Sequence, residues 1–200
     1  MREFESPPAY SAPPANVSRL LKTQALILGG FLLLIWALEL FDQLFLGGRL
    51  DSLGVRPGRL AGLSGILFMP FLHDGLAHVL ANSLPFAVLG WLVMVRRLTD
   101  FFLVAAVAAL VAGLGVWLFG REGTVHVGAS GLIFGFFGYL LLRAYFERSL
   151  ASISLALLVL LLYGGLLCGV LPSHMGVSWQ AHLFGFLGGV LAAYWLGNNH

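Results

Sequence analysis

The sequence predicts an all-α polytopic membrane protein with six transmembrane helices. Hydrophobic residues make up 59% of its 200 residues, charged residues make up only 10%, and the mean hydropathy is +0.92. A water-soluble domain carries about 25% charged residues, so this chain has too little charge to hydrate the surface of a soluble fold. At about 20 apolar residues per span, roughly six spans account for most of the chain. Helices are expected because an open strand edge in lipid leaves backbone groups without hydrogen bonds.

The elements follow from the apolar stretches in chain order. Residues 1–21 are polar and rich in proline, which predicts a disordered cytoplasmic tail. The next stretch is too long for the apolar region of a cleavable signal, so we expect the first span to stay in the protein. The membrane domain then extends over residues 22–197. Its six expected helices cover about residues 22–41, 75–95, 101–119, 129–146, 151–170 and 179–197. The irregular connection 42–74 is the longest of the loops and is expected to be more than a linker.

The basic residues predict that both termini are cytoplasmic. With the N-terminus inside, seven lie on the inner side and four on the outer side, and three of those four belong to the long connection. The inner set is Arg2, Arg19, Lys22, Arg96, Arg97, Arg143 and Arg148, and the outer set is Arg49, Arg56, Arg59 and Arg121. The second, fourth and sixth helices then run in one direction.

Composition excludes several classes of function. The net charge of +2 comes from 11 Lys and Arg spread along the chain, which leaves no basic patch for nucleic acid. A single cysteine, Cys168, excludes an intrachain disulfide and a zinc cluster of thiolates.

His126 is expected at the surface of an outer loop. Most ionisable residues of the spans lie near helix ends, where interfacial positions are expected: Glu39, Asp42, Asp100, Arg143 and Glu147.

Four other polar residues lie inside apolar stretches, all near the outer ends of the second, fourth and sixth helices. They are His78, Asn82, Ser130 and His182. His78 and Asn82 are four residues apart and therefore share a helix face. His182 shares its face with Gly185 and Gly189, a small-residue spacing that lets membrane helices approach closely. Each polar residue alone has a structural explanation, but their common depth favours a site.

This set of residues suits acyl transfer. A serine hydroxyl becomes nucleophilic when a neutral imidazole takes its proton, and Ser130 with His182 supplies this minimum pair. The free N–H groups at the start of a helix, together with His78 and Asn82, supply donors for a developing oxyanion. With no acid at that depth, the mechanism requires a dyad rather than a triad. Phe134, one turn after Ser130, is placed to stack on an imidazole.

These motifs resemble those of rhomboid intramembrane serine proteases. Gly128-Ala129-Ser130-Gly131 is similar to the family's GxSG, the segment Ala181–Gly185 to its AHxxG, and the segment His78–Asn82 to its HxxxN. Three motifs on the expected helices make a specific match, and the resemblance covers about residues 22–197.

The resemblance implies a six-helix rhomboid-like bundle with Ser130 as nucleophile and His182 as general base. It further implies that His78, Asn82 and the backbone near Ser130 stabilise the oxyanion, that His73 is structural, and that the loop 42–74 lies partly in the membrane. The implied substrates are single-pass transmembrane proteins, with no cofactor, metal or nucleic acid. The chain departs from the family where many members have a tyrosine, because it has Phe134, and it lacks the family's Trp-Arg pair near Ser64 and Gly65. We expect a multi-pass protein of a bacterial plasma membrane with its site near the outer face.

Access to this site is expected through the fifth span. That span is rich in leucine and lacks the mid-helix glycines of its neighbours, so it should pack loosely. Together with the loop 172–178 it is the candidate lateral gate, as the resemblance also implies.

Other functions fit the residues less well. A zinc protease needs the HExxH spacing, whereas His73 and His78 are five apart. An aspartyl protease needs two acids in mid-helix, and a transporter needs a polar path through the membrane. The strongest alternative is a rhomboid-like pseudoprotease that binds transmembrane helices without cleaving them. Such relatives usually lack the serine or the histidine, and this chain has both.

Overall fold

The computed structural model describes residues 17–172 and 177–198, and over these residues the chain is helical. Its α-helices are α1 (Val17–Phe41), α2 (Gly65–Phe68), α3 (Leu76–Met94), α4 (Leu98–Phe119), α5 (Ser130–Glu147), α6 (Leu150–Tyr163) and α7 (Trp179–Asn198). A π-helical turn, η1 (Asp42–Leu46), extends α1, and the 3₁₀ helix η5 (Gly164–Val170) extends α6. Three further 3₁₀ segments lie in the first loop: η2 (Leu50–Leu53), η3 (Leu60–Ser64) and η4 (Met69–Phe71).

The six expected helices correspond to α1, α3, α4, α5, α6 with η5, and α7. Residues 17–21, expected in the tail, form the first turns of α1, and residues 1–16 lie outside the described residues. By length and composition, four helical segments of the described chain can cross a membrane: Val17–Leu46, Leu76–Met94, Leu98–Phe119 and Leu150–Val170. The chain is therefore an all-helical integral membrane protein.

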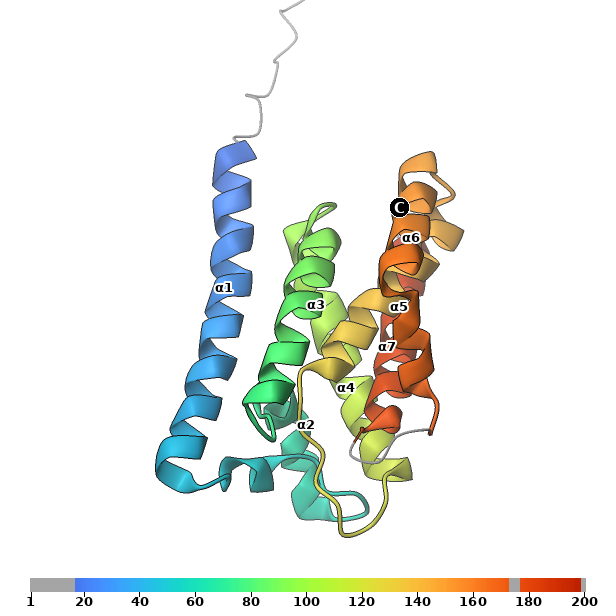
Figure 1. Ribbon diagram of the computed structural model, residues 1–200. Helices are drawn as coiled ribbons and strands as arrows, with labels where there is room; N and C mark the ends of the chain where they lie inside the picture. The colour runs from blue at the N-terminus through green and yellow to red at the C-terminus, as the bar shows by residue number, and fades with distance from the viewer. Residues whose placement is uncertain (1–16, 173–176, 199–200) are drawn as a thin grey trace, which may run out of the picture.

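The helix α5 occupies the centre of the bundle. Each of its residues from Gly131 to Leu140 is buried, and Figure 1 shows the other long helices around it, with α1 at the edge beside α3. A helix surrounded by protein need not be as apolar as one that faces lipid. This fits α5, which is not among the described segments apolar enough by themselves to cross a membrane.

The helices α5 and α7 touch through their backbones. A Cβ atom added to Gly185 would collide with the backbone of Gly131, and one added to Gly189 would collide with the Gly135 carbonyl. The predicted small-residue face of α7 thus packs against the small-residue face of α5. This close approach brings the first turn of α7 beside the first turn of α5.

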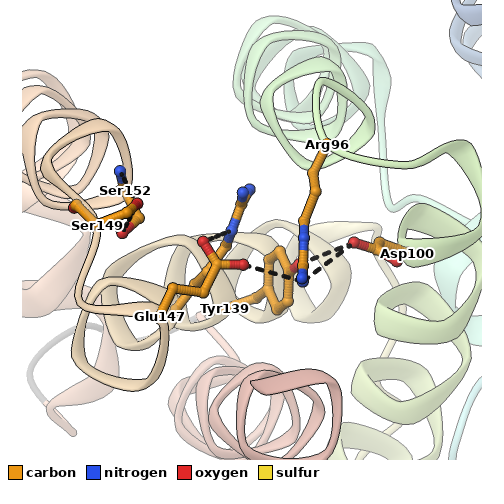
Figure 2. A network of polar contacts seen from close by, with 7 residues as sticks. Arg96, Asp100, Tyr139, Glu147, Ser149 and Ser152 are labelled. Carbon is orange, nitrogen blue, oxygen red and sulfur yellow. Dashed lines mark hydrogen bonds and ion pairs between the residues drawn. The ribbon is translucent and has the colours of Figure 1, made fainter. Parts of the chain in front are cut away.

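A partly buried polar network joins the turn after α3 to α4 and to the end of α5 that lies away from Ser130 (Figure 2). Arg96 lies 2.9 Å from a carboxylate oxygen of Glu147, and Arg143 lies 2.8 Å from the other. Asp100, which is 2% exposed, accepts a hydrogen bond from the Tyr139 hydroxyl at 3.2 Å. Asp100, Arg143 and Glu147 lie near helix ends, as the sequence indicates, but the helices meet there and partly or fully enclose these charges.

The acidic residues where α1 leads into the first loop are also buried. Glu39 and Asp42 are each 2% exposed, so both acidic side chains are enclosed by the protein. The Asp42 carboxylate accepts the backbone N–H of Leu50 at 3.1 Å, which holds the start of the loop under α1. Farther along, Val55 and His126 exchange two backbone hydrogen bonds of 3.0 Å. The loop is thereby attached to the segment that leads into α5.

Candidate active site

A cavity of about 980 Å³ opens beside the first turns of α3, α5 and α7. Its lining includes all four residues that the sequence nominated, namely His78, Asn82, Ser130 and His182. They come from three helices that are far apart in the sequence. In Figure 1, α3 and α7 begin at the same end of the bundle, and the connection from α4 runs back into the bundle before α5 starts.

Ser130 is the first residue of α5 and lies on the cavity wall. The backbone N–H groups of the first turn of a helix have no partner inside the helix. The N–H groups of Ser130 and Gly131 are of this kind, since the first intrahelical bonds run from Leu132 and Ile133 to the Ala129 carbonyl. In the part of the chain that the structure describes, no hydrogen bond joins the Ser130 hydroxyl to the His182 ring. Catalytic hydrogen bonds are often long in the absence of substrate and shorten when it binds.

His182 is held by two contacts. Its Nδ1 lies 2.9 Å from the Gly169 carbonyl oxygen, and its ring stacks on Phe134 with centroids 4.1 Å apart and planes 7° apart. A carbonyl oxygen only accepts, so Nδ1 carries the proton and Nε2 keeps its lone pair in the neutral ring. The ring is therefore in the tautomer that a general base requires. The predicted stacking role of Phe134 is present, without the hydroxyl of a tyrosine.

His78 and Asn82 provide polar atoms on the α3 side of the cavity. The Nδ1 atom of His78 pairs with the Asp74 carboxylate one turn earlier. Asn82 is 6% exposed, and its Nδ2 amide nitrogen is buried without a hydrogen-bond partner among the described residues. An unused buried donor costs about 1–3 kcal/mol, which a ligand with an acceptor oxygen could recover.

Gly128, two residues before Ser130, lets this wall form. Its φ is +120°, and an added Cβ would lie 2.8 Å from Cε1 of His78. A larger residue would be strained and would push α3 away. The first glycine of the GxSG motif thus has a steric reason in this chain.

His73 forms a hydrogen bond with the backbone of Ala129, the residue before Ser130. It is 1% exposed, and its Nε2 accepts the Ala129 N–H at 3.3 Å. Burial, and then the charge on His78, lower the pKa of His73 to about 4. The ring is therefore neutral and does not line the cavity, in keeping with the structural role that the resemblance implies.

Sequence reasoning missed three contributors to the site. Asp74 stands four residues before His78, a helical spacing that could have revealed the pair. Gly169 acts through its carbonyl, which no sequence pattern marks. His126, expected at the surface, lines the cavity and bonds the hydroxyls of Thr124 at 2.8 Å and Ser178 at 2.7 Å. Burial lowers the pKa of His126.

No group of three or more His, Cys, Asp or Glu side chains among residues 17–172 and 177–198 could hold a metal ion. His73, His78 and His182 therefore do not form a metal site in the described chain.

The sequence of the chain is similar to a family model and to several known proteins. Residues 60–199 match the family model described as "Rhomboid domain". "Uncharacterized protein Rv1337" from Mycobacterium tuberculosis is 44% identical over 174 residues, which are 83% of this chain and 72% of that protein. "Putative rhomboid protease YdcA" from Bacillus subtilis is 33% identical over 125 residues, 62% of each chain. "RHOMBOID-like protein 4" from Arabidopsis thaliana is 30% identical over 136 residues, 64% of this chain and 33% of that protein.

Proposed function

This chain belongs to the rhomboid family, and from that premise we propose that it is an intramembrane serine endopeptidase. It hydrolyses peptide bonds in or near transmembrane segments of membrane proteins through a dyad of Ser130 and His182. The observation that carries the proposal is that Ser130, His182, His78 and Asn82 line one cavity although they come from three helices. The Nδ1–H tautomer of His182 supports it further, because this tautomer leaves Nε2 free to take a proton.

The proposed reaction follows from these groups. His182 Nε2 takes the proton of the Ser130 hydroxyl as Oγ attacks the substrate carbonyl carbon. The resulting oxyanion accepts hydrogen bonds from Asn82 Nδ2 and from the free N–H groups at the start of α5. His78 donates to it through Nε2–H as an imidazolium, because the Asp74 carboxylate takes the Nδ1–H. The imidazolium then donates its proton to the leaving amine as the peptide C–N bond breaks. Water hydrolyses the acyl-enzyme by the same proton transfers in reverse.

The proposed setting is a bacterial plasma membrane crossed six times. In this proposal α5 and α7 cross the membrane together with the four apolar spans, and both chain termini are cytoplasmic. In Figure 1, α1 starts and α7 ends at the same end of the bundle, as an even number of crossings requires. The cavity then lies near the outer face, where water can reach it. Single-pass membrane proteins are the proposed substrates.

Access through the side of the bundle at α6 is part of this proposal. The Leu150–Val170 span is only 6% buried within the protein, the lowest share of the four apolar spans. Few side chains would have to separate for it to move. The other part of the predicted gate, the loop 172–178, lies mostly outside the described residues.

A fluorophosphonate probe tests the proposal against the pseudoprotease alternative. The wild-type protein should be labelled at Ser130, and Ser130→Ala and His182→Ala should not be labelled. Cleavage of a fluorescent single-pass substrate in proteoliposomes should be lost in the same two variants. Substrate binding by an intact wild-type protein that neither reacts with the probe nor cleaves would instead establish the binding protein.

A further inference from the structure

The hydrogen-bond acceptor of His182 comes from a helix that is loosely attached to the bundle. Gly169 lies in η5, the 3₁₀ continuation of α6, and η5 has no buried residue. In α6 itself only Ser152 and Val159 are buried. The helix α7 carries the His182 side chain, whereas η5 supplies the carbonyl oxygen that fixes the tautomer of the ring.

Only glycine lets this carbonyl come so close. A Cβ added to Gly169 would lie 2.8 Å from Cζ of Phe134 and 3.2 Å from Nδ1 of His182. Both atoms belong to the stacked pair of rings, so a side chain at 169 would press on the stack itself. The backbone of η5 therefore touches the base and its aromatic support together.

The same segment can move at low cost in packing. A 3₁₀ helix has poorer hydrogen-bond geometry than an α-helix, and no side chain of η5 is fully buried, with Leu166 only partly buried against the core. Movement of η5 away from α7 would nevertheless remove the hydrogen bond from Gly169, the one that the His182 ring makes within residues 17–172 and 177–198. Either ring nitrogen of an unpaired neutral imidazole can carry the proton. The ring would then be free to adopt the tautomer that cannot act as a base toward Ser130.

We propose that Gly169 is the positioning residue of the dyad: its carbonyl oxygen holds the proton of His182 on Nδ1, so the outer end of α6 determines whether the base is competent. This inference rests on the proposed Ser130–His182 chemistry. It adds that displacement of η5 would switch the base off while it opens the cavity. Proton transfer from Ser130 would then require η5 to return to His182 after a substrate has entered.

The substitution Gly169→Ala tests this inference, and Gly164→Ala is its matched control. Gly164 is the first residue of the same 3₁₀ helix, and a Cβ there would meet only Cδ1 of Leu160, at an ordinary 3.6 Å. Nitrogen-15 NMR of histidine-labelled protein in nanodiscs reports the tautomer at a pH where histidine is neutral, and His182→Gln identifies the signals. The wild type and the control should show a protonated Nδ1 and an unprotonated Nε2, and Gly169→Ala should show a mixture of tautomers.

The rate of fluorophosphonate labelling provides the second measurement. The small probe does not need a gate wide enough for a peptide, so its rate reports on the dyad rather than on access. We expect Gly169→Ala to lower this rate at least about ten-fold, since small misplacements of catalytic groups have effects of this size. An unchanged tautomer with an unchanged rate overturns the inference, and so does an equal loss in Gly164→Ala.

A backbone ester provides a variant that adds no atoms at the stack. Replacing Val170 by its α-hydroxy acid converts the Gly169 carbonyl into a weaker acceptor, and the same replacement at Gly165 weakens the Gly164 carbonyl as a control. Only the ester after Gly169 should shift the tautomer, and equal spectra for both esters would overturn the inference. If no variant reacts with the probe, the proposed protease activity fails, while the tautomer comparison still decides the role of Gly169.

Discussion

Replacing His73 with glutamine should flatten the dependence of the protein's stability on pH. The His73 ring is 1% exposed, and its Nε2 must stay unprotonated to accept the Ala129 N–H. Burial, followed by the charge on His78, lowers the pKa of His73 from an ordinary 6.5 to about 4. The unfolded chain therefore binds a proton at a pH where the folded protein does not.

The size of the effect follows from these two pKa values. The difference, 6.5 − 4, corresponds to about 3 kcal/mol at about 1.4 kcal/mol per pKa unit. The contribution is complete above pH 6.5, decreases as the pH falls toward about 4, and changes no further below that. Acidification over this window should therefore lower the free energy of unfolding.

Reversible unfolding in mixed micelles, followed by tryptophan fluorescence over this pH range, measures the effect. Glutamine at position 73 offers an amide oxygen to the Ala129 N–H but does not titrate. The other histidines and the carboxylates contribute to both proteins, so the difference between the two curves isolates His73. Parallel curves for the wild type and His73→Gln would refute the reasoning.

Three further perturbations test the contact between α5 and α7, the Asp100 network and the aromatic stack on His182. Gly189→Ala should lower the free energy of unfolding by about 1–3 kcal/mol, because the added methyl group meets the α5 backbone. Unfolding in mixed micelles measures this change. An unchanged unfolding midpoint would contradict the close contact between α5 and α7. Tyr139→Phe should cost about 1–3 kcal/mol in the same assay, because it leaves the buried Asp100 carboxylate without its hydroxyl donor. Phe134→Ala should slow fluorophosphonate labelling about ten-fold or more, because it removes the ring on which the His182 imidazole stacks. Phe134→Tyr keeps a ring at this position and should label at the wild-type rate.

Much of the architecture could be read from local composition. Apolar stretches of about 20 residues correspond to the six long helical segments, whose ends differ from expectation by only a few residues. The nominations of Ser130, His182, His78 and Asn82 were possible because polar side chains are rare inside apolar stretches. Their gathering around one cavity agrees with the depth argument, and their catalytic roles remain predictions.

The partners of these residues could not be read in the same way. Every residue has a backbone carbonyl, so the sequence does not mark the one at Gly169 that meets His182. The sequence places Arg96, Asp100 and Glu147 near helix ends but does not show that they contact one another. They are enclosed because the ends of three helices converge on them.

The sequence alone determined that the chain is a bundle of membrane helices with a cluster of polar residues near one end. It could do so because the cost of placing unpaired backbone or polar groups in lipid is a property of each segment by itself. Tertiary structure alone decided which groups touch, including the stack of Phe134 on His182 and the approach of η5 to both. Those contacts depend on how closely glycine faces let separate helices approach, and distances between segments are not encoded in the composition of any one of them.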